Sequence, residues 1–310
     1  MWLLLFPVVA GVLGAALLRL VLRAKRPRLD RPAALVTALA AGASSLIMIV
    51  FSTSTVIPMY VADVPSFPWE TYGAVRFVLP LALGILTVLL LGLPARSGRA
   101  GGAQLTRRTW TSFLSRPWVA ILGIVLALVV ILTLSAGVVS QPDEDGRFTR
   151  YVIELGNGGA ETDFYGWHYS MAPMIALVIL VVATVRAWAG IARPPHPEDV
   201  EQDIARRRLR STNVARITTG ALLLHLAAIL RDLESTSRLS LTVGAESGEH
   251  FSTGSAFSDL APFLEYGAPL VAAIGLGLWV HTALTALPAS AGSASAASPA
   301  GSASSRRETA

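Results

Sequence analysis

The sequence contains no cysteine and only one lysine, and these two shortages exclude several kinds of chemistry. Without thiols the chain has no disulfide, no thiolate metal site and no cysteine nucleophile. A retinal-type photoreceptor needs a lysine inside the membrane to form a Schiff base. The sole lysine, Lys25, lies between two apolar stretches rather than within one, so that class of protein is excluded as well.

Familiar catalytic and nucleotide-binding motifs are also missing from the sequence. It has no Gly-x-x-x-x-Gly-Lys phosphate loop, no Gly-x-Gly-x-x-Gly turn, no His-Glu-x-x-His zinc pair and no Gly-x-Ser-x-Gly nucleophile elbow. We therefore predict no catalytic residue, no metal site and no cofactor. The balance of these observations is against an enzyme.

Apolar sequence, by contrast, is abundant: 53% of the residues are hydrophobic, 15% are charged, and the mean hydropathy is +0.57. Seven stretches reach the roughly 20 residues that an α-helix needs to cross a bilayer, namely 2–22, 32–52, 72–94, 118–139, 169–191, 215–234 and 263–288. Because backbone groups cannot stay unpaired in lipid, each stretch is expected to be helical. We predict an all-α integral membrane protein with one seven-transmembrane-helix domain over residues 1–288. A disordered tail rich in Ala, Ser and Gly follows at 289–310.

The segments between the stretches alternate between basic and acidic or nearly neutral. Arginines gather in the first, third and fifth of these segments, whereas most acids lie in the others. Since basic loops stay in the cytoplasm, the N-terminus is predicted outside and the C-terminus inside. The net charge of +5 is then a signal of topology and of attraction to a lipid bilayer, rather than of nucleic-acid binding. The preference for Arg, Ala and Gly favours a bacterial protein of the plasma membrane.

The predicted outer loops carry the most distinctive sequence. Runs at 150–155 and 240–243 are strand-like and are followed by glycine-rich turns, which predicts small hairpins in an extracytoplasmic cap. Each outer loop ends in Tyr-Gly, at Tyr72, Tyr165 and Tyr266, through either an internal repeat or the preference of tyrosine for membrane interfaces. On the inner side, 197–208 is predicted to form a short surface helix, and 104–114 an amphipathic helix in the headgroup layer.

Two histidines within the apolar stretches are the first candidates for a site. His225 lies in the middle of the sixth stretch and His281 in the seventh, at similar depth when counted from their inner ends. A shared site could bind haem or a metal, or relay a proton. Hydrogen-bonded packing of two buried histidines is the simpler alternative.

A second candidate is the charged cluster at the outer end of the sixth stretch, where Arg231 and Asp232 adjoin. Arg76 and Glu265 are expected at a similar level on neighbouring helices. Arg231 lies about one turn inside the boundary and needs a partner, for which Glu265 or Glu70 is the obvious choice. The cluster is either a polar vestibule for an anion or a peptide, or a network of salt bridges that holds helix ends together.

These observations leave three classes of function. The first is a non-catalytic subunit or scaffold that acts with a membrane-protein partner or as a homo-oligomer. The second is a transporter or permease-like protein with a polar site near the sixth helix. The third is a haem- or metal-binding protein or intramembrane enzyme that uses His225 and His281. A transporter is expected to have a continuous polar cavity that reaches His225, and a dry, close-packed centre would count against transport.

Overall fold

The structure, a computed structural model, describes residues 2–21, 29–55, 58, 67–93, 113–156, 158–192, 200–244 and 250–286. Within them, six helices are long and apolar enough to cross a membrane: α2 (Arg31–Thr53), α4 (Trp69–Leu91), α5 (Arg116–Val139), α6 (Trp167–Ala192), α7 (Val200–Ser237) and α8 (Ala261–Ala286). The apolar helix α1 (Trp2–Val21) is shorter. The prediction of an apolar helical bundle is confirmed, whereas seven crossings and their orientation stay predictions.

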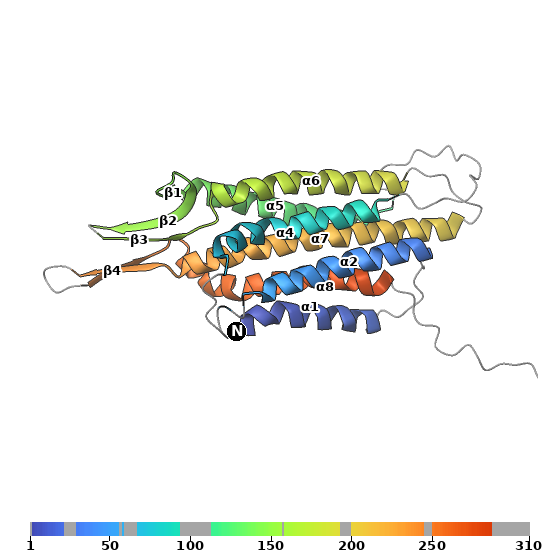
Figure 1. Ribbon diagram of the computed structural model, residues 1–310, viewed down its shortest axis with the longest axis horizontal. Helices are drawn as coiled ribbons and strands as arrows, with labels where there is room; N and C mark the ends of the chain where they lie inside the picture. Colours follow the sequence, from blue (N-terminus) through green and yellow to red (C-terminus); the bar gives the residue numbers. More distant parts are fainter. Residues whose placement is uncertain are drawn as a thin grey trace, which may run out of the picture.

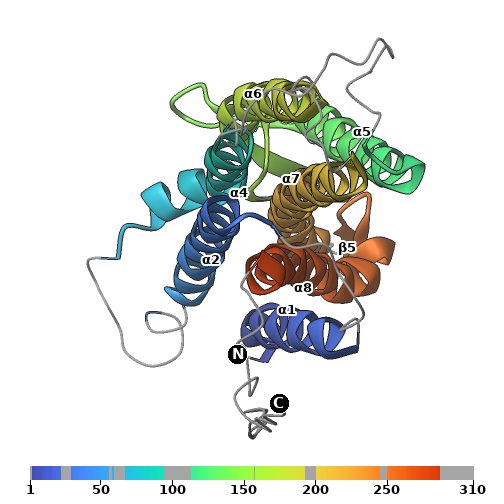
Figure 2. The ribbon, with the colours of Figure 1, turned by 90° about the vertical axis from the view of Figure 1, so that its right-hand side faces the viewer.

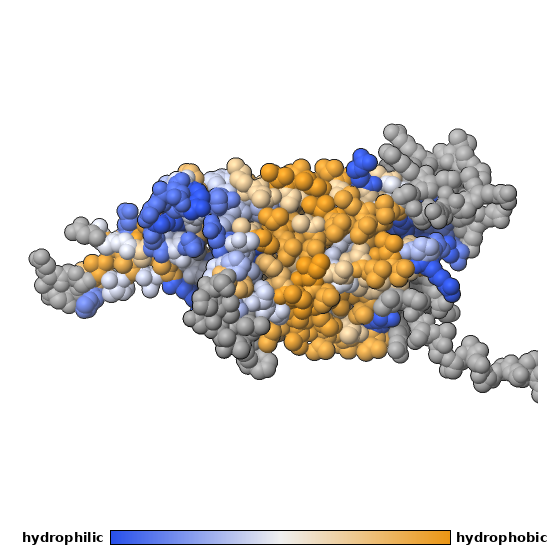
Figure 3. All heavy atoms as spheres, viewed as in Figure 1, coloured by the Kyte–Doolittle hydropathy of each residue, from blue (hydrophilic) through white to orange (hydrophobic). Residues whose placement is uncertain are grey.

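An apolar belt crosses the middle of the bundle on the face that Figure 3 shows. Large hydrophobic side chains face outward from several helices, among them Leu39, Ile124, Ile175 and Ile274, each at least half exposed. A contiguous surface of this kind would be unfavourable in water and marks contact with lipid. The bundle is that of a polytopic membrane protein.

Helix α7 is the central element and is longer than the sequence predicted. In its apolar part 78% of the residues are buried, against 22–44% in the other long helices. The separate surface helix at 197–208 and the span at 215–234 are one continuous helix from residue 200 onward, which corrects that prediction. No glycine or proline interrupts residues 200–219, so nothing in the sequence ends the helix there.

The other helices surround α7 as Figure 2 shows, with α4, α5, α6 and α8 packed against it and α1 on the far side of α8. Close approach of α1 and α8 depends on small residues. A Cβ added to Gly11 would lie 2.8 Å from the carbonyl oxygen of Ala273 and 3.3 Å from the nitrogen of Gly277. This interface therefore admits no side chain at position 11 without a shift of one helix.

A small β cap stands on one end of the bundle (Figure 1). Strands β1 (Gln141–Pro142), β2 (Phe148–Leu155) and β3 (Gly158–Asp163) form an antiparallel sheet, and β4 (Ser240–Gly244) pairs with β5 (His250–Gly254) before the short helix η1 (Ser258–Leu260). Both predicted hairpins are present. We call this end of the bundle the cap end and the opposite one the basic end.

The side chain of Tyr151 joins the two hairpins to each other. Its ring lies 5.5 Å from that of Phe164 and 5.6 Å from that of Phe257, measured between centroids. Its hydroxyl oxygen accepts a hydrogen bond from the backbone N–H of Ala256 at 3.1 Å. The cap is thus packed as one unit against the helix ends.

The three Tyr-Gly dipeptides occupy three different environments. Tyr72 stacks on Phe51 with the centroids 4.8 Å apart, Tyr165 is fully buried, and Tyr266 is 65% exposed. An internal repeat therefore stays a prediction. The tail at 289–310, Lys25 and most of the segment 104–114 lie outside the described residues.

Candidate functional site

A cavity of about 630 Å³ opens at the cap end, between α1, α2, α4, α7, α8 and the first hairpin. Charged side chains line its mouth, namely Glu70, Arg76, Asp143, Arg147, Asp163 and Arg231. Its deeper wall is apolar and consists of residues such as Met48, Pro80, Leu224, Ala228 and Ala272. A volume of this size is typical of sites for small organic ligands. We call it the cap-end cavity.

Beside this cavity, an ion pair between Arg76 and Asp232 joins α4 to α7. The Asp232 side chain is 4% exposed and that of Arg76 is 31% exposed, so the anion is the buried partner. The second carboxylate oxygen of Asp232 accepts the backbone N–H of Tyr165 at 2.6 Å. Both oxygens are therefore bonded, as a buried charge requires. The sequence placed Arg76 and Asp232 at one level, and the structure brings them together.

An aromatic layer lies directly beneath this ion pair. The guanidinium of Arg76 lies 4.5 Å above the ring of Phe77, a cation–π geometry, and that ring packs against Tyr165 with the centroids 4.5 Å apart. His225 Nδ1 donates to the carbonyl oxygen of Phe77 at 2.8 Å, since a carbonyl can only accept. The contact lies one turn before Pro80, which has no N–H to give to the carbonyl of Arg76.

The compact turn between β1 and β2 reaches over the cavity. Asp143 accepts the backbone N–H groups of Asp145 (3.0 Å) and Arg147 (2.8 Å), and Gly146 adopts a φ of 75° that favours glycine. Desolvation acts to raise the pKa of Asp143, but hydrogen bonds from Arg147 and Thr149 outweigh it and lower that pKa. The Arg147 guanidinium is held by Asp143 and Asp145 and extends to 3.7 Å from Glu70 at the start of α4, next to the cavity mouth.

Arg231 differs from the other arginines around the cavity. Its side chain is exposed, and no residue in the described part of the chain forms a hydrogen bond or ion pair with it. The two expected partners are engaged elsewhere, because Glu70 lies next to Arg147 and Glu265 pairs with Arg238 at 3.1 Å. The predicted pairing of Arg231 is therefore wrong. Its positive charge faces an open cavity instead.

The two candidate histidines do not share a site. Trp279 Nε1 donates to the carbonyl oxygen of Ile217 at 2.9 Å, which fixes the register of α7 and α8. His225 lies eight residues further toward the cap end, and His281 two residues further toward the basic end, so about 15 Å separates them along the bundle. The expectation that the two histidines lie at the same depth is wrong, because the end of α7 from which the depth was counted is not near Arg216. Within the described residues, no group of three or more His, Asp or Glu side chains could hold a metal ion.

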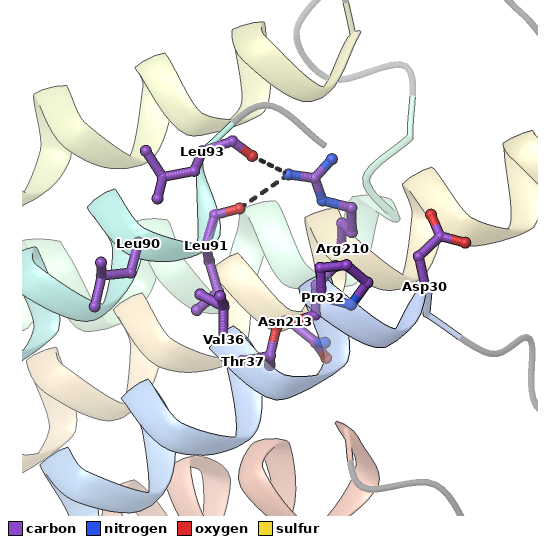
Figure 4. Close-up of a pocket in the computed structure, with 10 residues that line it drawn as sticks. Asp30, Pro32, Val36, Thr37, Leu90, Leu91, Leu93, Arg210 and Asn213 are labelled. Atoms are coloured by element: carbon purple, nitrogen blue, oxygen red, sulfur yellow. Dashed lines mark hydrogen bonds between the residues drawn. The ribbon is translucent and has the colours of Figure 1, made fainter. Parts of the chain in front are cut away.

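Arginines of α7 hold the ends of neighbouring helices at the basic end. Arg207 donates to the carbonyl oxygen of Ile191 at 2.6 Å, and Arg210 to those of Leu91 and Leu93 at 3.1 and 2.7 Å (Figure 4). These carbonyls end α6 and α4, where the helix dipole is negative and the oxygens lack helical donors. The long basic extension of α7 therefore ties two helices together.

A second cavity, of about 590 Å³, lies beside Arg210 (Figure 4). Residues of three helices line it, among them Asp30, Val36 and Thr37 from the start of α2, Leu90 and Leu91 from the end of α4, and Arg210 and Asn213 from α7. We call it the basic-end cavity. Neither this cavity nor the one at the cap end is lined by His225 or His281.

The sequence indicated the depth of the charged cluster but missed the first hairpin as part of its wall. The signal for Arg147 was weak, because its turn looked like any acidic loop.

In comparisons with known proteins, no family model, no curated protein and no solved structure matches this chain.

Proposed function

We propose that the chain is a non-catalytic multi-pass membrane protein that binds a small amphipathic anion in its cap-end cavity. The exposed guanidinium of Arg231 over an apolar wall is the observation that carries this proposal. A charged side chain that has no partner among the described residues and borders a cavity of ligand size is more consistent with recognition than with holding helices together.

The shape of the cavity supports a ligand with a charged head and an apolar tail. Leu224, Ala228 and Arg231 follow one another at helical spacing on one face of α7, so the charge stands above the apolar residues. Pro269 and Ala272 of α8 face the same space, and their small size leaves room for a chain. Arg76 lies at the same mouth, where its charge is balanced by that of Asp232.

The proposal includes an orientation. The arginines of the α7 extension lie at the basic end and the acidic turn between β1 and β2 at the cap end, which supports a cytoplasmic basic end and an external cap. The N-terminus of α1 would then lie outside and the chain in a plasma membrane. Its ligand would reach it from the outer leaflet or from the medium.

A partner subunit or a second copy of the chain remains part of the proposal. The hairpins stand beyond the helix ends and expose Phe148 and Phe251, which are 44% and 54% exposed. Aromatic residues on a rigid hairpin are common at protein interfaces. Co-purification from native membranes in mild detergent, followed by mass spectrometry, tests this element separately.

Equilibrium dialysis of radiolabelled decanoate against nanodiscs that contain the protein tests the main proposal. Decanoate should bind above the level of empty nanodiscs, whereas decanol and decyltrimethylammonium should not compete with it. Loss of one charge-assisted interaction in Arg231→Gln should weaken binding by about 10- to 100-fold. Arg238→Gln is the matched control, because Arg238 is an exposed arginine of the same end that pairs with Glu234 and Glu265.

Two results would contradict the proposal. If decanol competed as well as decanoate, the charge of the ligand would have no role in binding. If decanoate bound Arg231→Gln unchanged, Arg231 would have no role in binding. Acetate, which has the carboxylate but no apolar tail, is tested as a further competitor. Acetate that competes as well as decanoate would show that the apolar wall is not used.

A further inference from the structure

The rim of the basic-end cavity continues into the apolar outer surface of α2 and α4. Val36 on α2 and Leu93, just after α4, line the cavity and are 37% and 55% exposed. About one turn closer to the centre of the bundle, Leu39 and Leu89 are 62% and 51% exposed. Exposed apolar side chains of this kind mark contact with lipid. The cavity therefore lies within reach of the bilayer.

Most polar side chains of this cavity are already engaged. Asp30 forms an ion pair with Arg206 at 2.9 Å. The hydroxyl of Thr37 donates to the carbonyl oxygen of Ala33 at 2.7 Å. Arg210 donates to two carbonyls at the end of α4. These groups hold the helices together and are not the first choice for a ligand.

Asn213 is the exception among them. Its side chain lines the cavity (Figure 4), yet the residue is only 2% exposed. Its amide oxygen accepts from Arg216 at 3.5 Å, whereas no atom in the described part of the chain accepts a hydrogen bond from its amide nitrogen. A buried N–H donor without an acceptor is unfavourable. A ligand that brings an oxygen into the cavity would satisfy it.

The depth of Asn213 indicates which oxygen this is. Asn213 lies three residues from Arg210 toward the centre of the bundle, or about 4.5 Å along α7. Arg210 is level with the end of α4, and the apolar side chains of Val36 and Leu90 complete the wall. In a bilayer the ester groups of glycerolipids lie in the interfacial region, between the headgroups and the hydrocarbon chains. An ester carbonyl accepts hydrogen bonds and carries no proton to donate, so it matches a free amide N–H.

We propose that the basic-end cavity binds a glycerolipid of the adjacent leaflet, whose ester carbonyl accepts a hydrogen bond from the Asn213 amide. The glycerol region and the upper part of one acyl chain occupy the cavity of about 590 Å³, with the chain against Val36 and Leu90. The headgroup is not selected, because Asp30 and Arg210 are engaged within the protein. This site goes beyond anion binding at the cap end and rests on a different observation.

Ester and ether lipids with the same headgroup test the proposed hydrogen bond. The full chain in detergent is titrated with a diacyl phosphatidylcholine or with its dialkyl analogue, which lacks the carbonyls, and bound lipid is counted by native mass spectrometry. The diacyl lipid should bind about 3- to 10-fold more tightly, as expected for one neutral hydrogen bond. Asn213→Leu should abolish this preference and leave binding of the dialkyl lipid unchanged. Thr218→Val is the matched control, since Thr218 is a buried polar residue of α7 that bonds to Thr184 and lines neither cavity.

A second pair of variants tests the cavity itself. Val36→Trp fills its rim and should remove one bound lipid, whereas Leu39→Trp, on the outer surface of the same helix, should not. Equal binding of the two lipids, a preference that survives in Asn213→Leu, or the same number of bound lipids in both tryptophan variants would overturn the proposal. Competition by glycerophosphocholine, which has the headgroup but no chains, would also overturn it in favour of a soluble ligand. Decanoate binding at the cap end is unaffected by these variants, so the two proposals fail separately.

Discussion

The ion pair of Arg76 and Asp232 predicts an unequal response to the loss of either partner. Arg76→Gln leaves a carboxylate that is 4% exposed without its cation, which should cost about 3–5 kcal/mol. Asp232→Asn keeps an oxygen for the N–H of Tyr165 and leaves an arginine that is 31% exposed and can turn into the cavity. That change should cost about 1 kcal/mol.

The double variant Arg76→Gln/Asp232→Asn separates the pair energy from the single losses. Because it removes the uncompensated charge, it should be about 2 kcal/mol more stable than Arg76→Gln alone. Unfolding in mixed detergent micelles, followed by tryptophan fluorescence, measures all three. Arg147→Gln is the control for an exposed ion pair and should cost less than about 1 kcal/mol. Equal losses for the two single variants, or additive losses in the double variant, would refute a buried, coupled carboxylate.

Three further predictions use the same unfolding assay or hydrogen exchange. Gly84→Ala should lose about 1–3 kcal/mol by collision with Ala221, whereas Gly123→Ala, with open space around it, should not be destabilised. Arg210→Met should lose about 1–3 kcal/mol with its two carbonyl bonds at the end of α4. The pKa of Asp143 is lowered, so its ionised form stabilises the hairpin turn at all pH values above its ordinary pKa of 3.8. Protection of the amides in this turn from hydrogen exchange should therefore decrease as the pH falls below 3.8. Asp143→Asn should remove this pH dependence.

The sequence predicted most helix boundaries well because the bilayer and the turn residues determine them. The predicted span 32–52 is α2 (Arg31–Thr53), and 169–191 is α6 (Trp167–Ala192). The prediction failed at α7, where hydropathy ends the apolar stretch near residue 215 but the helix begins at Val200. Hydropathy reports contact with lipid, whereas the helix continues wherever its backbone and side chains find partners. Arg207 and Arg210 find theirs in the carbonyls of α6 and α4.

The sequence predicted how far along the helices the candidate site lies, but not in which direction each side chain points around the helix axis. Arg231 and Asp232 are adjacent in sequence, yet successive residues point about 100° apart on a helix. Asp232 therefore turns inward to Arg76, while Arg231 faces the cavity. The sequence contains no periodic signal strong enough to choose between these directions, because α7 is buried on nearly all sides. Only the packing of the helices in the structure shows which residues pair across them.

Arg231 differs from the paired arginines of the basic end once their partners are considered. At the basic end, Arg207 and Arg210 donate to helix carbonyls, and Arg206 pairs with Asp30, so their charge is used to hold helix ends. Arg231 at the cap end has no such partner among the described residues and borders a cavity. A count of positive charges would place a site for an anion at the basic end. The engagement of each guanidinium is the reason why we propose this site at the cap end instead, since a side chain that already holds a helix is less free to bind a ligand.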